Sequence, residues 1–461
     1  MAFINEHYLL TNQSAIKIYH MLMGELPIID YHNHLEAKEI FEDVPFENIA
    51  QMWLGSDHYK WRLMRAAGVE ERFITGDESD YLKFLAFASI MPYAIGNPVY
   101  HWTQLELKNY FGISELLNKK TANHIWHAAN QRINSEKLSP KKLISLSKVE
   151  KLCTTNDPVE NLIYHKMLAN SYTECAVIPT FRPDRAISVD TMGYLDYLKE
   201  LETVSQVKID SLETLVLALK ERATYFHEAG CVISDHSLEA YDFELEDQAT
   251  LELYFTQVLR GEALNQTRVN AIKTHLLSEL SKIYKEKNWV VQIHIGAIRN
   301  NSTNLYDTLG ANCGNDSIDD SASARTINRL LNHMSSVKTI LYHLNDAAMT
   351  SLATTVGNFQ GGVTPGQIQL GPAWWFNDHK AGIEHMLSTL SAQGLLGRFV
   401  GMVTDSRSFL SFSRHEYFRR ILANLLGKWV EEGNIPNDDD LLADIMRNIG
   451  YYNIKSFIEE K

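Results

Sequence analysis

The stretch "DSLETLVLALKERATYFHEAGCVISDH", residues 210–236, joins a predicted helix to a predicted strand and decides the fold class. Asp210 and Glu213 have the spacing of a capping box at the start of a helix, and Gly230 suits its end. The apolar run that follows, "CVISDH" (231–236), is typical of a buried strand. A helix that leads directly into a buried strand is the repeating unit of a parallel sheet covered by helices.

Similar β-like runs recur along the chain, and helical or polar stretches follow most of them. Eight such units predict a (β/α)8 barrel of the TIM type. The eight runs are "LPIIDYH" (26–32), "EKLCTT" (150–155), "ECAVIPTF" (174–181), "CVISDH" (231–236), "WVVQIHIG" (289–296), "KTILYHL" (338–344), "GQIQLGP" (366–372) and "RFVGMVTDS" (398–406).

The connection between the first two runs is unusually long. It holds roughly 115 residues, whereas an ordinary connection from strand to helix has about 2 to 6. Segments such as "DYLKFLAFASIM" (80–91) and "SELLNKKTANHIWHAANQRI" (114–133) have helical periodicity. We therefore predict that residues 1–34 and 149–461 form the barrel. Residues 35–148 are predicted to form a mainly α-helical insertion after the first strand, covering the barrel mouth.

Composition and charge exclude several classes of protein. The 461 residues are 45% hydrophobic, which is typical of a globular protein, and carry a formal net charge of -14. A surface of this sign repels nucleic acid backbones and anionic lipid, so we expect neither as a partner. No window has the 18 or so consecutive apolar residues that a membrane span needs.

The start of the chain and the cysteines indicate a cytoplasmic protein. "MAFINEHYLLTNQSAIKIYHMLM" (1–23) lacks the basic end and unbroken apolar stretch of a signal peptide. The cysteines are widely spaced, which favours buried thiols in a reducing compartment over disulfides or a thiolate metal site. They are Cys153, Cys175, Cys231 and Cys313.

Two histidines one residue apart end the first run, in "IIDYHNHLEA" (28–37). Side chains at positions i and i+2 of a strand point the same way, so His32 and His34 could both face one ion. The carboxyl ends of barrel strands are also where active sites lie. The alternative is a pair of hydrogen-bonded histidines in a packed loop.

A third ligand candidate ends the eighth run. Asp405 in "VTDSRSF" (403–409) is predicted to lie beside the first strand, although an aspartate there could also serve as a turn or cap residue. Two histidines and one aspartate leave coordination positions open, as in a catalytic rather than a structural metal site.

Other strand ends offer further polar residues. His294 ends the fifth run and His343 the sixth, and each could be a ligand, a proton shuttle or a structural histidine. The fourth run ends with Asp235 and His236 but has no lysine, which disfavours a bridged centre of two metals. We expect a single metal ion.

Longer motifs, taken in order along the chain, show a resemblance to one family. The sequence resembles the uronate isomerases (glucuronate isomerases), divergent members of the metal-dependent amidohydrolase-like barrels. The resemblance spans nearly the whole chain. It is carried by "DYHNHL" (30–35), "DHYKWRLMRAAGV" (57–69), "YHWTQLELKNYFGI" (100–113), "CTTNDP" (153–158), "PTFRPDRA" (179–186), "HIGAIRNN" (294–301), "NDSI" (315–318), "WWFND" (374–378) and "TDSRSFLSFSRHEYFRR" (404–420).

The resemblance implies an activity and a metal set. The family converts hexuronates between aldose and ketose forms, D-glucuronate to D-fructuronate and D-galacturonate to D-tagaturonate. Its pattern implies one divalent metal ion held by His32, His34 and Asp405. Zinc is the expected ion, but manganese or iron suits the same ligands. His343 departs from the expected pattern and is left open as an extra ligand, as is assembly into a homo-oligomer.

The resemblance also places Tyr59, His294 and Arg407 around the reacting carbons. Isomerisation moves a proton from C2 to C1 through an enediol and so needs an acid/base group and electrophilic help at the oxygens. Tyr59 is the expected proton-transfer residue, provided that positive charge lies near its phenol. His294 could relay protons or stabilise charge, and Asp405 could also accept a proton during ring opening.

The sugar acid needs a partner for its carboxylate. Arg407 follows Asp405 by two residues, so continued strand geometry would point both side chains the same way. Further candidates for substrate binding are Arg182, Arg299, Arg414 and, as a wall of the sugar pocket, Trp375. A solvated surface position is the alternative for each of these arginines.

Two other functions fit the same residues less well. A hydrolase with one metal ion on the same barrel would cleave an amide, lactone or ester through activated water. A non-catalytic protein that binds a sugar acid or a metal would show saturable binding without product.

Overall fold

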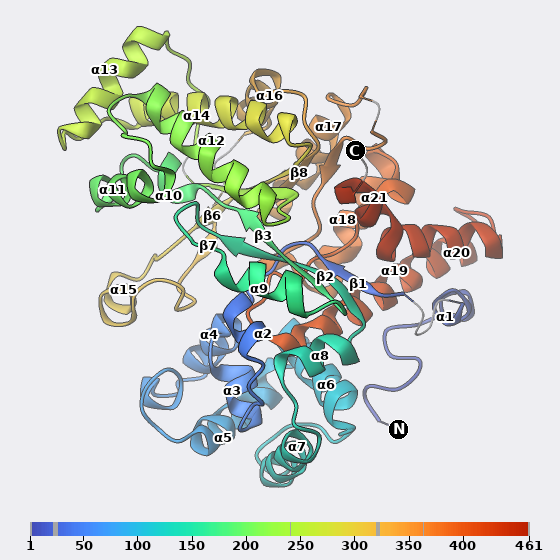
Figure 1. Ribbon diagram of the computed structural model, residues 1–461. Coiled ribbons are helices and arrows are strands. Elements are labelled where there is room, and N and C mark those ends of the chain that lie inside the picture. The colour runs from blue at the N-terminus through green and yellow to red at the C-terminus, as the bar shows by residue number, and fades with distance from the viewer. Residues whose placement is uncertain (1, 22–25, 240, 320–322, 363, 460–461) are drawn as a thin grey trace.

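The structure is a computed structural model that describes residues 2–21, 26–239, 241–319, 323–362 and 364–459. Its centre is a curled parallel sheet of seven strands in the order β1-β2-β3-β4-β5-β8-β9 (Figure 1). The strands are β1 Ile28–Asp30, β2 Val149–Asn156, β3 Ala176–Phe181, β4 Ile233–Leu238, β5 Val290–Ile295, β8 Thr339–His343 and β9 Ile368–Leu370. The predicted α/β class with a parallel sheet is confirmed.

The eighth predicted run, 398–406, does not form a strand. Its first residue ends a 3₁₀ turn, Leu396–Arg398. Two later residues, Gly401 (φ 80°) and Asp405 (φ 45°), have left-handed backbone angles that interrupt an extended chain. The segment nevertheless lies beside β1, because the Asp405 N–H donates to the His32 carbonyl (3.1 Å) and the His34 N–H donates to the Ser406 carbonyl (2.9 Å).

The helix in the opening stretch begins one residue later than the capping-box pattern predicts. Helix α12 spans Leu212–Glu228, and its cap is Ser211 rather than Asp210. The Ser211 hydroxyl accepts from the Thr214 N–H (3.1 Å), and the Thr214 hydroxyl accepts from the Ser211 N–H (3.0 Å). Gly230, with φ 92°, follows the helix end as predicted.

Helices fill the long connection between β1 and β2, and they lie together at one end of the sheet (Figure 1). Helix α5 falls within the first segment predicted to be helical, and α7 overlaps the second but ends at Glu136, three residues beyond it. Large buried rings, among them Trp53, Phe84 and Trp102, form the interior of this region. Its elements are α2 Ala37–Glu42, α3 Ile49–Leu54, α4 His58–Ala66, η1 Glu71–Phe73, α5 Asp80–Ile90, η2 Met91–Ala94, α6 Pro98–Phe111, α7 Ala122–Glu136 and α8 Pro140–Leu146.

The remaining helices cover the sheet or extend the chain at its ends. Among the described residues, none of the helices combines the length and apolar character needed to cross a membrane. A short antiparallel pair, β6 Ala297–Ile298 and β7 Ser317–Ile318, was not predicted. The helices are α1 Gln13–His20, α9 Ile163–Ser171, α10 Asp184–Ile187, α11 Tyr194–Ser205, α13 Gln248–Leu259, α14 Gln266–Glu286, α15 Thr303–Leu309, α16 Ala324–His333, η3 Asp346–Ala348, α17 Met349–Gly357, η4 Trp375–Asn377, α18 Lys380–Gln393, η6 Phe409–Phe412, α19 Ser413–Glu431, α20 Asp439–Arg447, η7 Asn448–Tyr452 and α21 Asn453–Glu459.

The space enclosed by the curled sheet is packed, not open. Tyr31, Gln292 and Tyr342 are fully buried there. The Tyr342 hydroxyl donates to the Gln292 side chain (2.5 Å), and the Tyr31 hydroxyl donates to the Gly401 carbonyl (3.0 Å). The first bond joins strand β8 to strand β5. The second joins the residue after β1 to the irregular segment 398–406. They form a rigid floor at the carboxyl ends of the strands.

Replacing buried His165 should flatten the pH dependence of stability. Its Nε2 atom bonds the Thr154 hydroxyl (2.8 Å), joining α9 to β2, and burial lowers the pKa of the imidazole to about 4. The unfolded chain binds a proton near pH 6.5 that the folded chain takes up only near 4, so wild-type stability falls as the pH drops through this window. His165→Gln should lose less stability between pH 7 and 5 in urea titrations. Exposed His127 gives the control, His127→Gln, which should follow wild type; equal pH slopes for all three proteins would contradict this account.

Candidate active site

The three residues predicted to bind a metal converge at the carboxyl end of β1. The Nε2 atoms of His32 and His34 lie 3.2 Å and 3.1 Å from the same oxygen of Asp405, Oδ1. Two backbone hydrogen bonds between residues 32–34 and 405–406 hold this geometry. Ligand atoms of the three residues lie within 4.8 Å of one another, which is close enough to surround one ion.

A second group of potential ligands shares His32 with the first. Asp235 of β4 and His294 of β5 are completely or almost completely buried, and His294 Nδ1 lies 2.7 Å from Asp235 Oδ1. His32 Nδ1 lies 3.9 Å from Asp235 Oδ2. Arg182 completes this side of the site with its Nη1 atom 3.1 Å from Asp235 Oδ2. His32 therefore faces one aspartate with each of its ring nitrogens.

Within the two groups of potential ligands, two buried imidazole nitrogens have no hydrogen-bond partner among the described residues. They are His32 Nδ1 and His294 Nε2. A buried polar atom left without a partner costs about 1–3 kcal/mol. Unpaired imidazole nitrogens beside carboxylates are the atoms that a bound divalent cation, or the groups around it, would engage.

The electrostatics favour ionised carboxylates and a neutral His34. Although burial opposes ionisation, Arg182, His294 and His32 hold the pKa of Asp235 well below its usual range. Burial likewise opposes ionisation of Asp405, but hydrogen bonds from His32 and His34 lower its pKa. Burial lowers the pKa of His34 to about 4 despite the nearby carboxylate. Charged oxygens and neutral imidazoles are the forms that bind metals.

A cavity of about 300 Å³ opens over this cluster. Most residues predicted from the sequence as catalytic, substrate-binding or metal-binding lie in its wall. The lining residues are His32, His34, His58, Thr155, Arg182, His294, Arg299, Asn312, Trp374, Trp375, Asp405 and Arg407.

Two of the predicted site residues, Tyr59 and Arg414, lie behind this wall instead of lining it. The Tyr59 ring stacks on that of His58, with centroids 4.8 Å apart. Burial, together with the charge of Asp405, raises the pKa of Tyr59 well above its usual value. The Arg414 guanidinium is 1% exposed and packs on the Trp102 ring, 3.8 Å from its centroid. Their functional roles remain predictions.

His343 and His236, which the sequence left open, lie outside both groups of potential ligands. His343 Nδ1 accepts from the Asn345 N–H at 3.0 Å, and the ring closely approaches Gly296. The His236 ring lies 5.6 Å from that of Tyr284, on the opposite face of β4 from Asp235.

Sequence reasoning did not identify His58, Thr155 or Asn312 as cavity residues. The signal for His58 was present, since it stands beside Tyr59 in "DHYKWR" (57–62). Asn312 had no such signal because it belongs to a loop, where side-chain direction follows no simple period. Arg407 does reach the cavity, although residues 398–406, whose strand geometry would have pointed it there, form no strand.

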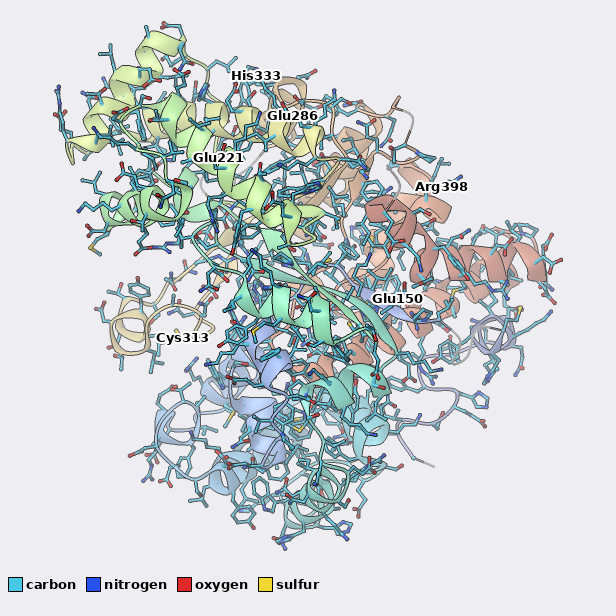
Figure 2. The ribbon with its side chains drawn as sticks, in the orientation of Figure 1. Glu150, Glu221, Glu286, Cys313, His333 and Arg398 are labelled. Atoms are coloured by element: carbon cyan, nitrogen blue, oxygen red, sulfur yellow. The ribbon has the colours of Figure 1, made fainter. Side chains whose placement is uncertain are left out.

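The loop that carries Asn312 is fastened to helix α4. Arg62 donates to the Asp316 carbonyl (2.6 Å), and Arg65 donates to that of Cys313. Figure 2 labels Cys313 on this loop, next to the helices between β1 and β2. Gly314 has φ 88°, and a Cβ there would lie 2.8 Å from the His58 carbonyl oxygen. The loop and His58 therefore fit against each other without spare room.

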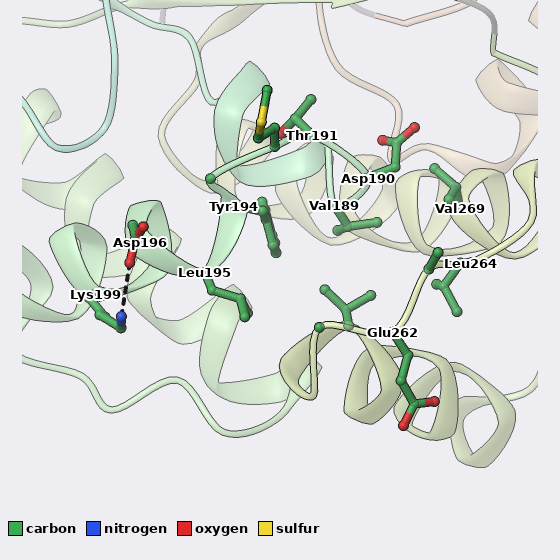
Figure 3. A pocket seen from close by; sticks show the side chains of 15 residues that line it. Val189, Asp190, Thr191, Tyr194, Leu195, Asp196, Lys199, Glu262, Leu264 and Val269 are labelled. Carbon is green, nitrogen blue, oxygen red and sulfur yellow. Dashed lines mark hydrogen bonds and ion pairs between the residues drawn. The ribbon is translucent and has the colours of Figure 1, made fainter.

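A larger cavity, about 640 Å³, lies elsewhere, between the start of α11 and the turn before α14 (Figure 3). Its charged residues include Asp190, Glu262 and an ion pair between Asp196 and Lys199 (2.9 Å). Neither group of potential metal ligands in the described chain belongs to it. The smaller cavity is therefore the candidate active site, because its wall contains the potential metal ligands.

Comparisons with known proteins agree along the whole chain. Residues 1–458 match the glucuronate isomerase family. A uronate isomerase of Caldanaerobacter subterraneus subsp. tengcongensis is 48% identical over 461 residues, 99% of each chain. One from Clostridium perfringens is 46% identical over 465 residues, again 99% of each. The crystal structure of a uronate isomerase from Thermotoga maritima is 35% identical, with a TM-score of 0.94 over 99% of this chain and 100% of that one.

Removing the two histidines that flank Asp405 should abolish metal binding. We expect His32→Ala combined with His34→Ala to lose the bound ion, because only the carboxylate would remain of the three ligands. Elemental analysis of purified, folded protein measures this. His236→Asn alters a buried histidine of β4 outside both groups of potential ligands and should keep the wild-type metal content. Full retention by the double variant would refute the ligand assignment.

Proposed function

Because this chain belongs to the glucuronate isomerase family, we propose that the cavity over His32, His34 and Asp405 binds a hexuronate and converts it between aldose and ketose. The family match over residues 1–458 carries this conclusion, together with 48% identity to a uronate isomerase over 99% of the chain. The enzyme is an aldose–ketose isomerase of hexuronates. D-glucuronate and D-galacturonate are the proposed substrates, with D-fructuronate and D-tagaturonate as products.

His32, His34 and Asp405 would hold one divalent ion, proposed to be zinc. The same His32 ring also faces Asp235, so a second ion at Asp235 would have to share this imidazole. An imidazole binds two metal ions at once only when neither of its nitrogens carries a proton. With one ion held by the three residues, Asp235 would remain free of metal and would orient the rings of His32 and His294, which both face it. When bound, such an ion polarises oxygens of the substrate.

Arg407 is the proposed principal partner for the substrate's carboxylate or a reacting oxygen. The other two arginines of the cavity are already paired: Arg182 with Asp184 and Asp235, and Arg299 with Glu239 at 2.5 Å. In the described part of the chain, Arg407 has no carboxylate within ion-pair distance. It is therefore the cavity guanidinium with the most freedom to bind a new anion.

Arg182, Arg299 and Trp375 would shape the sugar pocket around that contact. The Arg299 guanidinium lies over the Trp375 ring, 5.0 Å from its centroid, and this packing gives the pocket a flat wall. Arg182 would place positive charge beside the oxygens of the substrate while it neutralises Asp235. Both arginines support binding, but their charge is largely balanced before a substrate arrives.

Tyr59 is the proposed proton-transfer residue, with His58 beside it. Because its pKa is raised, the Tyr59 phenol is protonated at neutral pH and would act first as a donor. Burial lowers the pKa of His58, which keeps that imidazole neutral and able to accept a proton. In the reaction a base removes the C2 proton as O1 gains one; the enediol then receives a proton at C1 as O2 loses one. His294 would stabilise the charge that develops at these oxygens.

The proposed domain organisation explains how the two parts of the chain share the site. Residues 1–34 and 149–461 would form a barrel closed by the irregular segment 401–406 beside β1. Residues 35–148 would cover its mouth and supply His58 and Tyr59. Such a cover excludes water, which protects an enediol from side reactions.

An NMR time course with D-glucuronate in deuterated water tests the function. We expect ketose to form, and deuterium at C1 would report exchange of the migrating proton with solvent.

Tyr59→Phe should lower turnover by about 10²-fold or more, the range that general acid–base groups contribute, without loss of metal. Tyr110→Phe is the matched control, because it removes a buried hydroxyl that bonds Ser147 in the same helical region. Acid released from a lactone, without any ketose, would instead indicate a hydrolase.

Adding one methyl group to Gly314 should disturb the site from the loop side. In Gly314→Ala the new Cβ would meet the His58 carbonyl, so the loop or His58 must move. We expect kcat/KM for D-glucuronate to fall about tenfold or more, since small displacements of reacting groups are costly. Gly310→Ala also places a Cβ at a positive φ (78°), but no atom lies within 4 Å of the new Cβ. Equal losses in the two variants would show that backbone strain, not contact with His58, is responsible.

A further inference from the structure

Five charged side chains are buried together behind Tyr59, outside the cavity. None is more than 7% exposed. They come from four parts of the chain: the start of α4, α6, the turn after η4, and α19. Buried charges are expensive to desolvate, so a cluster of this size calls for an explanation beyond stability. Its members are Asp57, Lys60, Glu106, Asp378 and Arg414.

Ion pairs and hydrogen bonds connect these residues to the wall of the site. Lys60 pairs with Asp57, which also caps α4 by accepting from the Tyr59 N–H (3.0 Å). Glu106 accepts from the Trp53 indole (2.6 Å). Asp378 lies 3.6 Å from Arg414 Nη1. The backbone at Tyr59 is thus fixed by one end of the cluster, and Arg414 occupies the other.

Arg414 contacts both halves of the proposed catalytic machinery. Its guanidinium carbon lies 3.8 Å from the centroid of Trp102 and 5.5 Å from that of Tyr59. Its Nη1 atom donates to the carbonyl of Thr404 at 3.1 Å. Thr404 directly precedes Asp405, whose left-handed backbone (φ 45°) needs support from its surroundings. One side chain therefore supports the Tyr59 ring and the turn that presents Asp405.

We infer that Arg414 is a positioning residue, which holds the Tyr59 ring and the Asp405 turn in fixed relation without touching the substrate. This inference rests on the proposed function of Tyr59. A guanidinium suits the position because it is flat against Trp102, directs N–H groups in its own plane toward Thr404, and keeps its charge beside Asp378. A lysine ammonium could satisfy the charge but not the flat contact and the directed hydrogen bond together.

Arg414→Lys tests the inference, and Arg420→Lys is its matched control. Arg420 lies on the same helix, is 3% exposed, donates to the carbonyls of Glu6 and Tyr8, and packs on the Tyr19 ring at 4.4 Å. We expect Arg414→Lys to lower kcat by about 10- to 100-fold, the effect of misplacing a reacting group, with metal content and KM almost unchanged. Arg420→Lys should change kcat less than about twofold. Equal effects of the two substitutions would overturn the inference.

A double-mutant cycle with Tyr59→Phe separates positioning from a merely structural role. If Arg414 acts through Tyr59, Arg414→Lys should cost little more once the phenol is gone, so the two losses in kcat should not multiply. Losses that multiply would overturn this inference but leave the proposed function intact. Undiminished turnover by Tyr59→Phe alone would overturn the proposed role of Tyr59, and this inference with it.

Asp378→Asn provides a second route if Arg414→Lys does not fold. It keeps the shape of the side chain but removes the carboxyl group next to the guanidinium, so Arg414 loses one of its restraints. We expect a smaller fall in kcat at unchanged metal content, which again should largely disappear in the Tyr59→Phe background. A full additional loss in that background would count against the inference.

Discussion

The site depends on the junction between the end of β1 and the segment 401–406. The Asp405 carboxylate lies within hydrogen-bond distance of two imidazoles, and the Asp405 N–H donates to the His32 carbonyl. One residue therefore joins segments 371 positions apart in the chain. Two backbone hydrogen bonds hold its left-handed backbone in place. The Asp405 N–H donates to the His32 carbonyl, and the His34 N–H donates to the Ser406 carbonyl. Those bonds hold the backbone at both histidines against Asp405, so the proposed ligands lie close together in the folded chain.

Many charged side chains are buried around this junction, and they form two groups. One group lies beside the cavity and the other lies behind Tyr59. In front, Asp235 pairs with both Arg182 and His294 beside the cavity. Behind, Arg414 and Asp378 lie close to Tyr59 but out of reach of the cavity. In a medium of low polarity these charges act strongly over short distances, so small changes in their geometry should affect the reacting groups more than the global fold.

The helical region between β1 and β2 contributes a side chain to the cavity wall. Helix α4 presents His58, and the loop that carries Asn312 is fastened to the same helix by Arg62 and Arg65. Each element restrains the other, since Gly314 leaves no space beside the His58 carbonyl. These contacts explain why the loop with Asn312, which is distant from His58 in the sequence, contributes to the same cavity wall.

The sequence alone determined the α/β class, seven of the strands and the helices after β1. It also placed His32, His34 and Asp405 together as ligand candidates, and the structure brings these three residues close to one another. Those features follow from local rules: hydrophobic period, the alternation of side chains on a strand, and motifs carried by neighbouring residues. Only the tertiary structure decided that 398–406 is irregular, that Asn312 reaches the cavity, and that Arg414 lies beneath Tyr59 and not in the pocket. Backbone angles at Asp405, loop direction and the sharing of buried charges arise from contacts between distant segments, and no local pattern in the chain encodes such contacts.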